Sequence, residues 1–226
     1  MVNLVLLRHG ESIWNLENRF TGWTDVDLTQ KGIEESRQAG ESLRKEGITF
    51  DITYTSALKR TIKSAFFTLD AMDLLWIPVR KCWMLNERHY GALQGMNKDE
   101  AARRYGQAQV QEWRRGYNQA PPLLDKSDRT HPVHDFRYSL VSPSLLPSSE
   151  SLWEASVRIK NIWDTGIKKR LVSGKRILVS AHGNTLRALT AILEEIPEDE
   201  IPKLEFATGE LRKYKIDPIT HEVCRV

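Results

Sequence analysis

Two short apolar runs in this 226-residue chain each end in the dipeptide His-Gly. The first run, residues 4–7, leads into Arg8 and His9, and the second, residues 177–181, leads into His182. An imidazole is substantially neutral at pH 7 and can act as a nucleophile, and a following glycine lets the backbone approach a ligand closely. A single histidine at a strand end is more often a packing residue. Two such histidines, one of them preceded by arginine, favour a shared catalytic site.

The cations around these histidines indicate phosphoryl transfer. That reaction needs positive charge at the non-bridging oxygens and a nucleophile in line with the leaving group. Arg8 and Arg60 carry planar guanidinium groups suited to phosphate, and a helix expected after His182 would offer free N–H groups to the same anion. We predict that His9 carries the phosphoryl group and that Glu87 gives a proton to the leaving alkoxide. On spacing alone, Glu87 could equally be a solvated loop carboxylate.

Composition is that of an ordinary globular protein, with 40% hydrophobic and 28% charged residues and a net charge of +3. The charge is uneven: residues 59–115 hold 11 Lys/Arg against 6 Asp/Glu, a difference of 11 − 6 = +5. This basic middle suits a small anionic ligand or a solvated face, and we expect no nucleic-acid partner. No apolar run approaches the roughly 18 residues of a membrane span, and no secretory signal begins the chain. We therefore expect a cytoplasmic protein with no membrane association.

Neither cysteines nor histidines have the spacing of a metal site. Cys82 and Cys224 are far apart in the sequence and are expected to be free thiols. The histidines and carboxylates lack the short spacings of metal-ligand motifs. We expect no metal.

The pattern of elements predicts an α/β fold. Strands are expected at residues 4–8, 50–55, 76–79 and 175–181, with an edge strand or hairpin at 210–226. Helices are expected at 30–45, 57–72, 98–105, 109–115, 151–171 and 185–194, and the segment 14–23 is expected to be a loop at the carboxyl edge of the sheet. This order predicts a single domain over residues 1–226, in three layers, with a mostly parallel central sheet and helices on both faces.

A long irregular segment separates the two halves of this pattern. Residues 120–149 hold five of the nine prolines, and the α/β rhythm resumes after them. Segments of this length without regular structure are usually functional or disordered. We predict that residues 117–150 form a lid or packed loop within the domain.

The sequence resembles the histidine phosphatase superfamily, and more narrowly the cofactor-dependent phosphoglycerate mutases, which use 2,3-bisphosphoglycerate. The resemblance covers nearly the whole chain. The motifs that carry it are Arg8-His9-Gly10-Glu11-Ser12, Trp14-Asn15, Asn18-Arg19-Phe20-Thr21-Gly22-Trp23, Tyr54-Thr55-Ser56 with Lys59-Arg60, Leu85-Asn86-Glu87-Arg88-His89-Tyr90-Gly91, Trp113-Arg114-Arg115, Leu146-Pro147, Glu150-Ser151-Leu152 and residues 181–189.

The resemblance implies a role for each matching residue. His9 would be the phosphorylated nucleophile and Glu87 the general acid and base, while Arg8, Arg60 and His182 would hold the transferring phosphoryl group. The remaining implied substrate-binding residues are Asn15, Thr21, Gly22, Arg88, His89, Tyr90, Lys98, Arg114, Arg115, Gly183 and Asn184.

The implied reaction is the interconversion of 3-phosphoglycerate and 2-phosphoglycerate, in glycolysis and gluconeogenesis. It would proceed through phospho-His9, primed by 2,3-bisphosphoglycerate, without a metal. The implied assembly is a homo-oligomer, most simply a dimer.

Alternatives share the same scaffold. A bisphosphoglycerate mutase is less favoured because Glu11-Ser12 and Thr21-Gly22-Trp23 are retained. A phosphatase would not need the full set of substrate-clamping cations. A non-catalytic anion-binding protein would need neither His9 nor Glu87.

Two departures from the family pattern bear on this choice. Glu210-Leu211-Arg212 stands where an apolar residue and proline usually follow Thr208-Gly209, and the sequence stops at Val226, before the longer tail of many relatives. We expect water to reach phospho-His9 more easily than in long-tailed relatives, and the ratio of phosphatase to mutase activity to be higher.

Overall fold

Six strands form one mixed sheet in the part of the chain that the computed structural model describes, residues 2–217, 219–220 and 222–226. The strand order is β3-β2-β4-β1-β5-β6. The parallel strands are β1 (Leu4–Arg8), β2 (Ile52–Thr55), β3 (Val79–Lys81) and β4 (Ile177–Ala181). β5 (Leu211–Ile216) is antiparallel to β1, and β6 (Val223–Arg225) is antiparallel to β5.

β1 and β4 lie side by side in the middle of the sheet, and both are buried. Their register pairs Leu4 with Ile177 and Arg8 with Ala181. Because side chains alternate between the faces of a strand, Leu4 and Leu6 face one half of the core and Val5 and Leu7 the other. The continuous apolar run of β1 therefore follows from burial on both faces.

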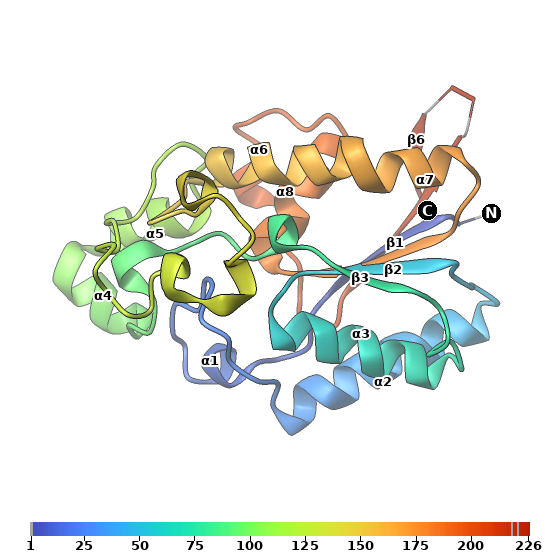
Figure 1. Cartoon of the computed structure of the whole chain (residues 1–226), viewed down its shortest axis with the longest axis horizontal. Helices are drawn as coiled ribbons and strands as arrows, with labels where there is room; N and C mark the ends of the chain where they lie inside the picture. The colour runs from blue at the N-terminus through green and yellow to red at the C-terminus, as the bar shows by residue number, and fades with distance from the viewer. Residues whose placement is uncertain (1, 218, 221) are drawn as a thin grey trace.

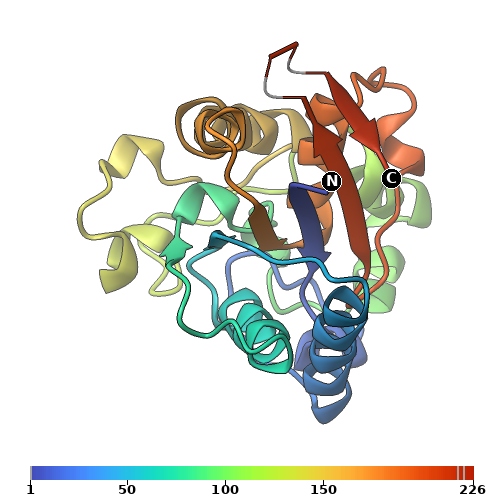
Figure 2. The ribbon, with the colours of Figure 1, turned by 90° about the vertical axis from the view of Figure 1, so that its right-hand side faces the viewer.

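Helices cover both faces of the sheet (Figures 1 and 2). α2 (Gln30–Lys45) and α3 (Lys59–Ala71) pack together on one face. α6 (Leu152–Ile162), α7 (Lys168–Val172) and α8 (Gly183–Leu193) lie on the other. This arrangement confirms the predicted α/β fold with a mostly parallel sheet between two helical layers.

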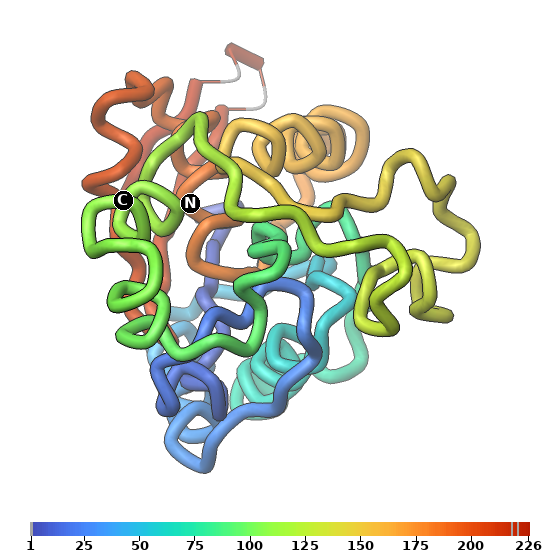
Figure 3. The backbone as a smooth tube through the Cα atoms, turned by 90° about the vertical axis from the view of Figure 1, so that its left-hand side faces the viewer, coloured from blue at the N-terminus to red at the C-terminus, as the bar shows by residue number. Residues whose placement is uncertain are grey.

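The loops at the carboxyl ends of the parallel strands gather on one side of the molecule (Figure 3). They carry the short α1 (Ile13–Leu16) and the helices α4 (Lys98–Tyr105) and α5 (Gln107–Arg115). Residues 117–150 lie beside them and contain only the short 3₁₀ helices Pro132–His134, Phe136–Tyr138 and Pro143–Leu145. The predicted irregular segment is thus a packed loop of short turns.

Three local predictions differ from the structure. The strand expected at 76–79 begins only at Val79, because Ile77 closes a turn by donating to the Leu74 carbonyl. The expected loop at 14–23 contains α1, which begins with a capping box between Ser12 and Asn15. The helix expected at 151–171 is interrupted by a π-helical turn, Trp163–Ile167.

Candidate active site

His9 follows β1 directly and is 3% exposed. Its Nδ1 lies 2.7 Å from the Gly10 carbonyl oxygen, and since a carbonyl only accepts, Nδ1 carries the proton. The Nε2 lone pair is therefore free to attack. Burial, and next the charges of Arg60 and Arg8, hold the pKa of His9 well below its usual range. The lowered pKa keeps the ring in its neutral form at pH 7.

His182 lies beside His9 because β1 and β4 are neighbours in register. The two ring centroids are 5.1 Å apart. Nε2 of His182 is 2.9 Å from the Ser56 hydroxyl, whereas its buried Nδ1 has no partner. Burial and then the Arg60 charge hold the pKa of His182 well below its usual range. His182 also precedes α8, whose N-terminal end attracts negative charge: the Asn184 N–H there already donates to the Glu87 carboxylate.

Two arginines flank His9. Arg60, in the first turn of α3, is 1% exposed and donates to the carbonyls of Gly22 at 2.7 Å and Thr24 at 2.9 Å. Arg8 donates to the Phe206 carbonyl. The Nε atoms of both guanidinium groups are buried without a partner. Burial lowers the pKa of Arg60 to about 10, which leaves it charged at neutral pH.

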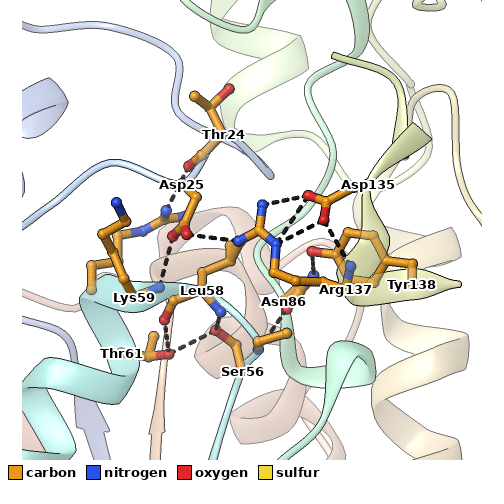
Figure 4. A network of polar contacts seen from close by, with 12 residues as sticks. Thr24, Asp25, Ser56, Leu58, Lys59, Thr61, Asn86, Asp135, Arg137 and Tyr138 are labelled. Carbon is orange, nitrogen blue, oxygen red and sulfur yellow. Dashed lines mark hydrogen bonds and ion pairs between the residues drawn. The ribbon is translucent and has the colours of Figure 1, made fainter. Parts of the chain in front are cut away.

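A polar network fixes the loop at Thr24 and Asp25, whose Thr24 carbonyl accepts from Arg60 (Figure 4). Asp25 accepts from the backbone N–H of Lys59 at 2.7 Å and pairs with Arg137 at 2.7 Å. Asn86 donates to the Tyr138 hydroxyl at 2.8 Å. Residues 135–138 of the 117–150 loop are thereby joined both to the loop at Asp25 and to Asn86, the residue before Glu87.

Glu87 lies in an extended segment that follows the 3₁₀ helix Trp83–Leu85. Its Oε1 accepts from the backbone N–H groups of Arg88 at 2.9 Å and Asn184 at 3.2 Å. The carboxylate therefore sits at the start of α8, where it lines the same cavity as His9.

One cavity of about 280 Å³ contains these groups. Among the residues predicted from the sequence, those that line it are Arg8, His9, Asn15, Thr21, Gly22, Arg60, Glu87, Tyr90, Lys98, Arg114, Arg115, Gly183 and Asn184. The elements that bring them together are the segments after β1, β3 and β4, the first turn of α3, and the helices α4 and α5. Apart from Glu87 and Glu205, the charged lining residues are cations.

Three predicted site residues lie behind this lining. His182 is buried next to His9. Arg88 is fully buried and donates to the Tyr90 hydroxyl at 3.1 Å and the Arg114 carbonyl at 3.0 Å. His89, predicted to bind substrate, instead packs edge-on against Trp23 and accepts the Gly91 N–H at 3.0 Å. Its side chain points into the backbone of its own turn, so it holds the loop and does not line the cavity.

Five lining residues were missing from the predicted site: Arg19, Phe20, Arg187, Glu205 and Phe206. Arg19 and Phe20 belong to a motif that the sequence displayed, and Arg187 to the helix after His182. Arg187 is 3% exposed and holds Asn184 Oδ1 at 2.8 Å and the Arg115 carbonyl at 3.0 Å. Glu205 and Phe206 lie neither at a predicted strand end nor in a cluster of cations, so no pattern in the sequence indicated them.

The departure at 210–212 anchors one wall of the cavity. We call residues 205–210 the strap. Arg212, 7% exposed, lies 3.5 Å over the Phe206 ring and donates to Glu210 at 3.0 Å and to the Glu205 carbonyl. The strap in turn gives Arg8 its carbonyl partner and places Glu205 2.6 Å from Arg115.

No helix in the described part of the chain is long and apolar enough to cross a bilayer. Within residues 2–217, 219–220 and 222–226, no three His, Cys, Asp or Glu side chains gather as a metal site would require. Cys82 and Cys224 are free thiols.

A mostly parallel sheet covered by helices on both faces, with a buried histidine between two arginines at its carboxyl edge, is an arrangement suited to phosphoryl transfer. The sequence profile of the histidine phosphatase superfamily (branch 1) matches residues 4–133, more than half of the chain. The chain belongs to this superfamily.

Solved structures of similar fold include several phosphatases. A mycobacterial glucosyl-3-phosphoglycerate phosphatase is 21% identical with a TM-score of 0.75, over 100% of this chain and 97% of that one. The YhfR protein of Bacillus stearothermophilus is 22% identical with a TM-score of 0.74, over 98% and 94%. The alpha-ribazole phosphatase of Shigella flexneri is 20% identical with a TM-score of 0.69, over 95% and 90%. At these identities the likeness concerns the fold.

Proposed function

We propose that this protein interconverts 3-phosphoglycerate and 2-phosphoglycerate by way of phospho-His9. The observation that carries the proposal is the distribution of cations in the cavity. Arg8 and Arg60 flank His9, and a second set, Lys98, Arg114 and Arg115, lines the same cavity. A ligand with negative charge at both ends, such as a phosphorylated acid, satisfies both sets.

The proposed chemistry uses the chain's own groups. The Nε2 lone pair of His9 forms the N–P bond while the P–O bond of the donor breaks, and Glu87 protonates the leaving oxygen. Arg8, Arg60 and the N–H of Gly183, at the start of α8, hold the non-bridging oxygens. In the reverse direction Glu87 takes the proton from the acceptor hydroxyl, and the phosphoryl group leaves His9.

The residues present fit a bisphosphorylated cofactor. The unpartnered, buried Nε atoms of Arg8 and Arg60 and Nδ1 of His182 are suited to phosphate oxygens at one end. Lys98, Arg114 and Arg115 would hold the distal phosphate. When bound, 2,3-bisphosphoglycerate supplies the phosphoryl group that loads His9.

A phosphatase is the second candidate, and two observations favour it. Several structures of similar fold are phosphatases. In addition, Glu205 pairs with Arg115 and reduces the positive charge at the distal end, which would suit a substrate with a less anionic distal group. In this case water, deprotonated by Glu87, would attack phospho-His9.

Product analysis separates the two candidates. The protein is incubated with 3-phosphoglycerate and a trace of 2,3-bisphosphoglycerate, with and without a chelator, and both 2-phosphoglycerate and inorganic phosphate are measured. A mutase gives mainly 2-phosphoglycerate, and the predicted metal independence requires that the chelator leaves the rate unchanged. Inorganic phosphate as the main product would instead identify a phosphatase. Absence of both products would contradict the proposal.

A further inference from the structure

A buried ion pair lies directly behind Glu87. Arg158, on α6, is 9% exposed, and its guanidinium donates to three backbone carbonyls: Met84 at 2.8 Å, Asn86 at 2.8 Å and Glu87 at 2.9 Å. It also forms a fork with the Glu150 carboxylate, at 2.7 Å and 2.8 Å. All of its nitrogen atoms are thus engaged with the segment around Glu87 or with the carboxylate that compensates its charge.

Glu150 fixes the other side of the same segment. It is 4% exposed, and its Oε2 also accepts the backbone N–H of His89 at 2.8 Å. Its own N–H donates to the His89 carbonyl at 2.9 Å. Arg158 therefore fixes the backbone at Glu87, and Glu150 fixes it two residues further on, at His89.

Glu87 is held by its main chain at the point where its side chain enters the cavity. Its carbonyl accepts from Arg158 and from Trp23 Nε1, the latter at 2.6 Å. A buried ion pair contributes little to stability compared with well-packed apolar residues, so stability alone gives no reason for this arrangement. A general acid, in contrast, must lie within hydrogen-bond reach of the oxygen it protonates.

We propose that the Arg158–Glu150 pair is a positioning device that sets Glu87 for proton transfer. This inference rests on the proposed phosphoryl transfer to His9. Arg158 and Glu150 touch neither substrate nor the reacting atoms, and they act through the backbone of residues 84–89.

Two phosphoryl donors that differ in their leaving groups show whether the proton donor is correctly placed. When His9 attacks phosphorus, the electron pair of the broken P–O bond goes to the leaving oxygen. With 2,3-bisphosphoglycerate as donor, the released alkoxide needs the proton from Glu87, whereas p-nitrophenolate is a stable anion and leaves without one. Loss of correct Glu87 placement therefore slows the first reaction selectively.

The test compares kcat/KM for 2,3-bisphosphoglycerate and p-nitrophenyl phosphate as phosphoryl donors to His9, which reports the steps up to release of the first leaving group. Arg158→Lys keeps the charge, but an ammonium cannot reproduce the fork and the three carbonyl contacts. Glu150→Gln removes the charge and keeps the shape. We expect each variant to lose about tenfold or more with 2,3-bisphosphoglycerate and less than about threefold with p-nitrophenyl phosphate, by comparison with the 10²–10⁴-fold typical of general acid catalysis.

Two controls make the result specific. Glu87→Gln should give the same selective loss, and Arg158→Lys in that background should add little further. Arg176→Lys disrupts a similar arginine fork, on Asp51, outside the cavity residues, and should change neither rate. The ratio of the two rates does not depend on the fraction of protein that is folded.

Equal losses with both substrates would show that the pair is only structural and would overturn the inference, as would full activity of a folded Arg158→Lys. Failure of the proposed function has a different signature: the unaltered protein would transfer phosphate to His9 from neither donor.

Discussion

At the scale of single residues, buried histidines distinguish this protein. His9, His182 and His89 are each at most 3% exposed, and burial lowers all three pKa values, that of His89 to about 3. For His9, the low pKa keeps the nucleophile neutral below pH 6.5. The lowered pKa values also affect stability, because histidines in the unfolded chain are solvated and have the ordinary pKa of about 6.5.

Stability should fall as the pH is lowered from 7 to 5. The unfolded chain binds a proton at His89 below pH 6.5, whereas the folded protein does not until about pH 3. The unfolded state therefore gains protons first, and stability rises with pH over this range. His89 alone accounts for about 2 kcal/mol between pH 6.5 and pH 5. Urea unfolding at pH 6.5 and at pH 5 measures the free energy of unfolding. In His89→Gln, its decrease between these two pH values should be smaller by about 2 kcal/mol.

The exposed His134 provides the matched control. His134→Gln should leave the pH dependence of the free energy of unfolding as it is. An identical pH dependence in His89→Gln and the unaltered protein would refute the assignment of a neutral, buried His89.

At the scale of elements, the site is built by the paired strands β1 and β4 and by the strap, residues 205–210. β1 and β4 are paired, so the residues that follow them, His9 and His182, are neighbours. After His9 the chain packs against α2: a Cβ on Gly10 would lie 2.0 Å from the Gly32 carbonyl oxygen, so only glycine fits there. The strap forms one wall of the cavity and depends on Arg212 of β5.

Replacing Arg212 should weaken phosphate binding. Arg212→Leu removes the contact with Phe206 and the hydrogen bond to the strap, so the carbonyl that holds Arg8 is no longer fixed. We expect the dissociation constant of inorganic phosphate to rise by about tenfold, as for the loss of one hydrogen bond to a charged group. Isothermal titration calorimetry measures this directly.

Lys213→Leu, one residue along β5, is the matched control, because Lys213 contacts Glu46 and lies outside the strap. Unchanged phosphate affinity in Arg212→Leu would mean that the strap holds Arg8 without this residue.

Sequence patterns anticipated most of these elements for physical reasons. Apolar runs such as residues 4–7 mark strands that must be buried, and strand-end residues in a parallel sheet converge at one edge. His89 looked like a site residue by its motif, but its Nδ1 serves the Gly91 N–H. Glu205, Phe206 and the Arg158–Glu150 pair depend on long-range contacts that no local pattern records. The role of Arg212, noted only as a departure, likewise needed the fold.

At the scale of the whole molecule, the turn that leads into the edge strand β3 and the first residue of that strand leave apolar groups in solvent. Trp76 is 78% exposed, Leu75 46% and Val79 41%. An exposed strand edge with large apolar side chains is a ready surface for association. This feature agrees with the predicted homodimer, which stays a prediction.

Light scattering coupled to size exclusion tests the assembly. We expect a mass of two chains for the unaltered protein and of one chain for Trp76→Glu, because a carboxylate at that position would have to be desolvated. Leu140→Glu, at a fully exposed leucine of the 117–150 loop, serves as the control and should leave the mass unchanged. A single-chain mass for the unaltered protein would contradict the prediction.

The central claim, that His9 accepts the phosphoryl group, is tested most directly by trapping the phosphoprotein. The protein is incubated with radiolabelled 2,3-bisphosphoglycerate and quenched in alkali, and the labelled peptide is mapped by mass spectrometry. We predict an acid-labile label on His9, absent in His9→Ala and present in the control Arg176→Lys. No label, or a label on His182 or another residue, would contradict the account.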